Sequence, residues 1–155
     1  MKVTRLELSG LQLIELKVFT DNRGFFTERF NSKNFAANGL PNNFVQANHS
    51  RSVPGVIRGL HYQVSPAQGK LVGAIRGTIY DVAVDIRPGS PTFGKHVGVE
   101  LSDKNGRLLW VPAGFAHGFC ATGAEAADVI YNVDALYCPE TEGGIHWADP
   151  EASRR

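Results

Sequence analysis

The sequence has no long apolar run and almost no excess of charge of either sign. None of its apolar stretches approaches the length of a membrane span, and its N-terminus lacks the pattern of a signal peptide. Sixteen basic and fifteen acidic residues give a net charge of +1, which argues against a protein that wraps nucleic acid or lies on a membrane. We therefore expect a cytoplasmic protein with no nucleic-acid or membrane partner.

Cysteine is also scarce. Cys120 and Cys138 are the only two in the chain, and their spacing matches neither a metal site nor a redox motif, so we expect two free thiols. Hydrophobic residues make up 43% of the chain, enough to build a core, which excludes a disordered protein. The 155 residues fit one compact domain, and no repeat, linker or low-complexity tract divides them.

Short β-type runs separated by Gly, Pro and Asn turns dominate the pattern. Apolar residues alternate loosely with other residues over 11–18, as in a half-buried strand. Ser32 is expected to cap a short helix over residues 33–38 that ends at Gly39. Further strands are expected at residues 44–49, 56–62, 70–76, 78–86, 95–101, 107–111, 117–121 and 127–133. This spacing predicts an antiparallel sandwich or barrel, with no closing strand after residue 140.

Two stretches could supply chemistry. His61 can act as a base near neutral pH, and Lys70 can neutralise a developing oxyanion. The alternative is that neither residue is catalytic, and that His61 is a partly exposed histidine and Lys70 a solvated lysine. In the strand that follows, period-two alternation places Asp81 and Asp85 on one face, either solvated or turned toward a substrate or a histidine.

A glycine, five residues and then Pro-x-Gly-x-x-His, ending at His117, resemble the second cupin motif, whose histidine points into a β-barrel. In the first cupin motif Gly55 and His61 fit, but Gln63 stands at the second histidine and Gln68 near the glutamate. Amides are poor substitutes for imidazole and carboxylate at a transition metal. We therefore predict an all-β jelly roll with one or two short helices, without a metal.

Seven blocks in one order resemble the dTDP-4-dehydrorhamnose 3,5-epimerase family. They are Phe19-Thr-Asp-Asn-Arg-Gly-Phe-Phe-Thr-Glu28, Phe44-Val-Gln-Ala-Asn-His-Ser-Arg-Ser52, Arg58-Gly-Leu-His61 with Ala67-Gln-Gly-Lys-Leu71, Asp81-Val-Ala-Val-Asp85, Ser90-Pro-Thr-Phe-Gly94 and Pro112-Ala-Gly-Phe-Ala-His-Gly-Phe119. The match runs nearly ungapped from about Gln12 to Pro150, far more specific than a single motif.

This resemblance implies a substrate and a reaction. The substrate class is a thymidine-diphosphate (dTDP) 4-keto-6-deoxyhexose, used to make rhamnose or a related deoxysugar. Its C4 ketone acidifies the hydrogens at C3 and C5. A base removes one proton, an enolate forms, and an acid returns a proton from the opposite face without a cofactor.

Matching positions imply the residue roles. His61 matches the base, Lys70 the cation near the enolate oxygen, and Tyr131 the acid on the other face. Arg58, Asp81 and His117 match residues that line the sugar pocket, and the nucleotide-diphosphate set comprises Phe19, Arg23, Glu28, Gln46 and Asn48. The family forms homodimers that exchange an N-terminal strand, so some of that set is expected to serve the partner's site.

Strict alternation raises a geometric difficulty, because it places Arg58 and His61 on opposite faces of one strand. If both line a pocket, the strand must be irregular between them. Gly59 is the residue that would permit a bulge there.

Two departures from the family pattern leave alternatives open. Family members usually continue past Pro150 into a segment with a carboxylate that hydrogen-bonds the base, and no counterpart is expected in this chain. It is then a shortened version of a longer enzyme, or a short member in which Asp81 or Asp149 orients His61, or a fold with weakened or altered chemistry that inverts one carbon. Leu136 replaces a family tyrosine, which affects nucleotide preference or only packing.

Two other classes of function compete with the epimerase. A metal-dependent cupin, such as an oxygenase, would need ligands that Gln63 and Gln68 do not provide. A non-catalytic sugar-nucleotide-binding module has no evident need for an acid such as Tyr131 facing a base.

Overall fold

The computed structural model describes residues 1–149 and is built almost entirely from short antiparallel strands. They are β1 (Lys2–Arg5), β2 (Gln12–Glu15), β3 (Val18–Asp21), β4 (Gly24–Thr27), β5 (Gln46–Ser52), β6 (Ile57–Gln63), β7 (Lys70–Arg76), β8 (Thr78–Asp85), β9 (His96–Ser102), β10 (Arg107–Val111), β11 (Phe115–Ala121), β12 (Ala127–Val133) and β13 (Glu142–Gly144). Helix α1 (Ser32–Ala37) and the 3-10 helix η1 (Pro139–Thr141) complete the described elements.

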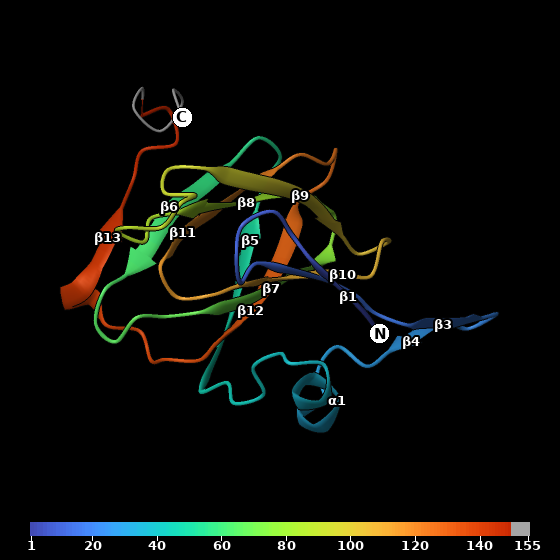
Figure 1. Ribbon diagram of the computed structural model, residues 1–155. Helices are drawn as coiled ribbons and strands as arrows, with labels where there is room; N and C mark the ends of the chain where they lie inside the picture. Colours follow the sequence, from blue (N-terminus) through green and yellow to red (C-terminus); the bar gives the residue numbers. More distant parts are fainter. Residues whose placement is uncertain (150–155) are drawn as a thin grey trace.

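Two sheets face each other and form a sandwich (Figure 1). The six-stranded sheet has the order β1-β2-β10-β7-β12-β5, and the five-stranded sheet has the order β13-β6-β11-β8-β9. Apolar side chains from the inner faces of both sheets, including Val72, Ile79, Leu101, Leu109 and Val129, form the main core. The cupin-like all-β fold predicted from the sequence is confirmed.

The central strands of the six-stranded sheet, β7 and β10, are buried on both faces. The outer face of this sheet carries a second apolar cluster, in which Leu71, Leu108 and Trp110 pack beneath Phe35 of helix α1. Burial on both sides explains the nearly continuous apolar composition of β7 and β10 and holds these central strands firmly in place.

Strands β3 and β4 form a separate hairpin that projects away from the two sheets (Figure 1). Its aromatic side chains face solvent in the single chain, with Phe19, Phe25 and Phe26 exposed by 52%, 64% and 68%. Three neighbouring exposed phenylalanines are unusual on the surface of a monomer and typical of a contact surface.

Several predicted elements differ from the observed ones. The strand expected at residues 11–18 is split into β2 and β3, because the chain leaves the sandwich at Leu16 and Lys17. Asn31, not Ser32, caps α1 by accepting a hydrogen bond from the Asn34 amide at 3.1 Å.

The expectation of no closing strand was wrong for part of the C-terminal stretch. Strand β13 pairs with β6, with Gly143 opposite Tyr62, whereas residues 150–155 lie outside the described part of the chain. No helix within residues 1–149 is long and apolar enough to cross a membrane.

Candidate functional site

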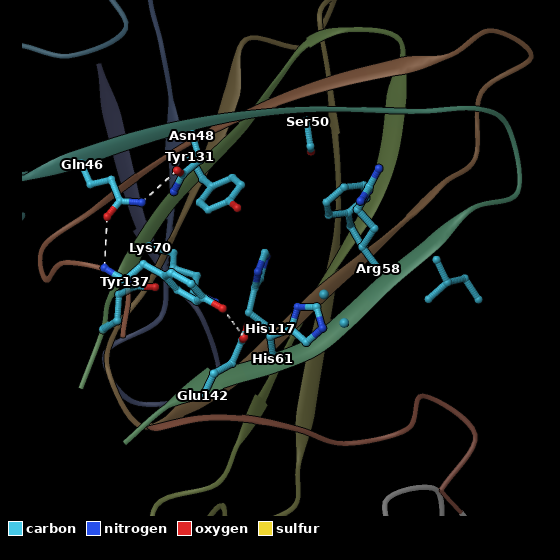
Figure 2. Close-up of a pocket in the computed structure, with 15 residues that line it drawn as sticks. Gln46, Asn48, Ser50, Arg58, His61, Lys70, His117, Tyr131, Tyr137 and Glu142 are labelled. Carbon is cyan, nitrogen blue, oxygen red and sulfur yellow. Dashed lines mark hydrogen bonds between the residues drawn. The ribbon is translucent and has the colours of Figure 1, made fainter. Parts of the chain in front are cut away.

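A cavity of about 680 Å³ opens between the two sheets (Figure 2). It lies where strands β5, β7 and β12 of one sheet face β6 and β11 of the other, with β13 beside them. Its lining residues are Gln46, Asn48, Ser50, Ile57, Arg58, Gly59, His61, Gln68, Lys70, His117, Gly118, Phe119, Tyr131, Tyr137 and Glu142.

The three residues expected to move or stabilise protons meet in this cavity. His61 projects from β6 of the five-stranded sheet, whereas Lys70 and Tyr131 project from β7 and β12 of the opposite sheet (Figure 2). Lys70 pairs with Val133, two residues from Tyr131, so Lys70 and Tyr131 share one face of their sheet. An imidazole therefore lies on one wall and a phenol and an ammonium on the other.

The predicted bulge at Gly59 is confirmed and allows Arg58 and His61 to line the same cavity. His61 pairs with His117 and Arg58 with Phe119, so two residues of β6 lie opposite Gly118 alone. Gly59 has a φ of +108°, and a Cβ there would lie 2.6 Å from the carbonyl oxygen of His117. Only glycine fits both the backbone angle and the close approach of β11.

Burial shifts the acidity of two cavity groups in opposite directions. It lowers the pKa of Lys70, an effect that the charges of Glu142 and Asp81 oppose. It raises the pKa of Tyr131, an effect that the Arg58 cation opposes. The phenol therefore keeps its proton to a higher pH than a free tyrosine.

Asp81 was expected to line the sugar pocket but is not part of the cavity wall. Its side chain is fully buried, and its Oδ1 lies 2.9 Å from Nε2 of His117, which does line the cavity. Asp81 is thus one step removed from the cavity, because its strand position points into the core. Asp85, on the same face, accepts hydrogen bonds from Arg87, Ser90 and Thr92 and fixes the β8–β9 loop.

The prediction that Asp81 orients His61 is therefore wrong, because the Asp81 carboxylate contacts His117 instead. Within residues 1–149 no side chain hydrogen-bonds the His61 ring. Asp149, the other candidate, is the last of the described residues, where its backbone N–H donates to the carbonyl of His146 at 2.9 Å, and its role toward His61 stays a prediction.

Polar groups continue along the wall formed by β5. The amide of Gln46 donates to Asn48 at 2.9 Å and accepts from the Tyr137 N–H at 3.0 Å. The Tyr137 hydroxyl donates to Glu142 at 2.7 Å, and this bond raises the pKa of Tyr137. Both predicted residues of β5, Gln46 and Asn48, thus face the cavity.

Sequence reasoning missed Ser50, Tyr137 and Glu142 as cavity residues. Period-two alternation from Gln46 and Asn48 could have identified Ser50. Glu142 has no such signal, because it reaches the cavity only through the pairing of the three-residue strand β13 with β6.

Three members of the expected nucleotide-binding set lie elsewhere in this chain. Phe19 and Arg23 are on the projecting hairpin, where Arg23 forms an ion pair with Asp21 at 2.6 Å. Glu28 accepts hydrogen bonds from Asn31 and Asn34 at the start of α1. None of the three lines the chain's own cavity.

Gln63 and Gln68, which stand at the metal-ligand positions of the cupin motif, use their side-chain amides to hydrogen-bond the backbone. Gln63 donates to the carbonyls of Pro66 and Leu136, and Gln68 to the carbonyl of Ala135. Over residues 1–149 no group of three or more His, Cys, Asp or Glu side chains is arranged to hold a metal ion.

Comparisons with known proteins relate this fold and cavity to one group of enzymes. A family model described as dTDP-4-dehydrorhamnose 3,5-epimerase matches residues 5–154. The dTDP-4-dehydrorhamnose 3,5-epimerase of Pseudomonas aeruginosa is 54% identical over 152 residues, covering 97% of this chain and 83% of the relative.

Solved structures agree with the sequence comparisons. The dTDP-6-deoxy-D-glucose-3,5-epimerase of Legionella pneumophila, crystallised with dTDP-4-keto-L-rhamnose, matches with a TM-score of 0.94 and 48% identity, covering 98% of this chain and 81% of the other. The dTDP-4-dehydrorhamnose 3,5-epimerase of Bacillus anthracis, with TDP and PPi bound, matches with a TM-score of 0.94 and 45% identity, covering 98% and 87%. The similarity thus extends over nearly the whole chain.

Proposed function

Since the chain belongs to the dTDP-4-dehydrorhamnose 3,5-epimerase family, we propose that it inverts C3, C5 or both in a dTDP-4-keto-6-deoxyhexose during deoxysugar biosynthesis. The observation that carries this proposal is that His61, Lys70 and Tyr131 open into one cavity, with the imidazole and the phenol on opposite sheets. Inversion needs a proton to leave one face of a carbon and another to arrive on the opposite face.

The residues divide the reaction as follows. His61 takes the proton from the carbon next to the ketone, and the electron pair of the broken C–H bond moves to the C4 oxygen as an enolate. Lys70 stabilises that negative oxygen. Tyr131 then gives its proton to the opposite face of the carbon while the carbonyl re-forms, and exchange with solvent restores the imidazole and the phenol.

Removal of water around Lys70 and Tyr131 supports these roles. A buried ammonium acts on a developing oxyanion more strongly than a solvated one, because little solvent screens the charge. The Tyr131 phenol is protonated at neutral pH, as a proton donor must be, because its raised pKa lies above that of a free tyrosine.

The proposal includes a homodimer in which the β3–β4 hairpin of each chain serves its partner. Phe19 and Arg23 match family positions for the nucleotide diphosphate but lie outside their own cavity, and the hairpin exposes Phe25 and Phe26. A second copy that receives the hairpin explains both observations.

The proposal also includes a cytoplasmic location, which fits the free thiols of Cys120 and Cys138.

Deuterium wash-in tests the proposal. The protein is incubated in heavy water with the dTDP-4-keto-6-deoxyhexose, and proton NMR follows the loss of the C3 and C5 signals. We expect label at C3, C5 or both, and none with the His61→Gln variant. Absence of label at both carbons with the unchanged protein would overturn the proposal.

A further inference from the structure

Residues 134–138 carry Tyr137 to the cavity without forming a helix or a strand. Such a segment leaves its backbone N–H and C=O groups without the partners that regular secondary structure supplies. What holds these groups therefore decides where Tyr137 lies.

Glutamine side chains supply the missing partners at four consecutive residues. Gln68 donates to the carbonyl of Ala135 at 2.8 Å, and Gln63 to that of Leu136 at 3.0 Å. Gln46 accepts from the N–H of Tyr137 at 3.0 Å, and Gln63 accepts from that of Cys138 at 2.8 Å. The glutamines come from β5, the end of β6 and the loop before β7.

Gln63 is the central member of this set. It is 7% exposed and does not line the cavity, and its amide nitrogen also donates to the carbonyl of Pro66 at 2.7 Å. Its oxygen and its nitrogen are both used on backbone groups, so any effect of Gln63 on a ligand must act through the segment that it holds.

The segment in turn shapes the cavity wall. The Tyr137 hydroxyl bonds to Glu142, and both residues line the cavity. The groups assigned to proton transfer do not depend on it, because His61 and Tyr131 project from strands paired on both sides.

We propose that Gln46, Gln63 and Gln68 form a glutamine clamp that positions Tyr137, and that the clamp sets the affinity for the nucleotide-sugar without setting the rate of proton transfer. This inference rests on the proposed function. Gln63 is a positioning residue in it, acting on the substrate through Tyr137.

A first experiment needs no substrate. In the dimeric full chain, Gln63→Leu removes the acceptor for Cys138 and the donor for Leu136, and hydrogen exchange is followed by mass spectrometry or NMR. We expect the amides of Tyr137 and Cys138 to exchange at least about tenfold faster than in the unchanged protein. Gln12→Leu is the matched control, because Gln12 is the only other glutamine, lies on β2 and does not line the cavity.

A second experiment measures ligand affinity and turnover. We expect Gln63→Leu to weaken thymidine diphosphate binding and to raise KM by about tenfold each, because apparent affinity falls with the fraction of molecules that hold the segment in place. The value of kcat stays within about threefold, since transition-state contacts are unchanged. Gln12→Leu changes none of these quantities.

Failure of the clamp and failure of the proposed function give different results. Two results overturn the clamp, whatever the activity of the parent protein. One is unchanged amide exchange in Gln63→Leu, and the other is a fall in kcat of about tenfold with KM unchanged. A parent protein without isotope exchange overturns the function while the amide measurement still tests the clamp. If Gln63→Leu does not fold, Gln68→Leu, which loses only the bond to Ala135, is held to the amide-exchange outcome alone for the Ala135–Cys138 segment, because Gln68 itself lines the cavity.

Discussion

Single residues on facing strands divide the proposed reaction. His61 and Tyr131 belong to different sheets, so the sandwich itself keeps the proposed base and the proposed acid on opposite walls of the cavity. Removal and return of a proton are then separable, and each step can be disabled by one substitution.

Replacement of Tyr131 with Phe separates the two steps. We expect the formation of inverted sugar to fall by about 10²–10⁴-fold, the usual contribution of a general acid. Exchange of the substrate hydrogen for deuterium continues at the face of His61, because the base and Lys70 remain. Proton NMR of the sugar in heavy water measures both quantities, and equal loss of exchange and inversion would contradict the assignment of Tyr131 as the acid.

The lowered pKa of Lys70 predicts where activity is lost at alkaline pH. The ammonium loses its proton as the pH rises through this lowered pKa, earlier than an ordinary lysine would, and kcat should fall with it. Lys70→Arg keeps its charge to much higher pH, so its activity, though lower, should hold further into the alkaline range. A pH profile of kcat for both proteins checks this, and identical alkaline limbs would contradict it.

Seven of the 15 cavity residues were predicted as site residues, several of them because they lie in short motifs. His61, Arg58, Lys70 and His117 follow from the cupin-like and family patterns. Glu142 was not predictable, because a Glu-Gly-Gly run has little strand propensity and reaches the cavity only by pairing with β6.

At the scale of elements, the bulge in β6 is the feature on which the cavity depends. A regular strand would turn Arg58 away from His61. The bulge instead keeps both on the cavity wall, and hydrogen bonds from Arg58 to Ser52 at 2.8 Å and to the Arg51 carbonyl at 2.9 Å hold the guanidinium.

Substitution of Gly59 by Ala tests this dependence. The new methyl group would meet the His117 carbonyl at 2.6 Å, so we expect a loss of about 2–4 kcal/mol in the free energy of unfolding and a strong fall in turnover. Gly55→Ala is the control, because Gly55 also has a positive φ, +81°, but has no atom within 4 Å of the added Cβ. Urea unfolding and the exchange assay measure both effects, and equal losses in the two variants would contradict the steric account.

Prediction of elements succeeded where strands are apolar and bounded by turn residues. The ranges 70–76, 107–111 and 127–133 were predicted to the residue and form β7, β10 and β12. Strand β1 and the β3–β4 hairpin were missed because their side chains are largely exposed and give no clear hydrophobic period.

At the scale of the whole molecule, the projecting hairpin leaves a single chain with exposed aromatic side chains and a cavity that lacks three members of its expected nucleotide-binding set. A second copy supplies what is missing in the proposed dimer. This arrangement has a consequence for mixtures of inactive variants.

Arg23→Ala and His61→Gln chains should restore activity when mixed. In a mixed dimer with exchanged hairpins, one cavity has an intact His61 and receives an intact Arg23, so after full subunit exchange activity should recover to about a quarter of that of the unchanged protein. Light scattering verifies that both variants are dimers. No recovery would mean that each hairpin serves its own chain or that no dimer forms.

The glutamine clamp also separates recognition from chemistry along the chain. The side chains assigned to proton transfer stand on strands paired on both sides, whereas residues 135–138 are held by four hydrogen bonds to glutamine side chains. Substitutions confined to these residues could therefore alter nucleotide-sugar affinity while the strands that carry His61, Lys70 and Tyr131 keep their positions.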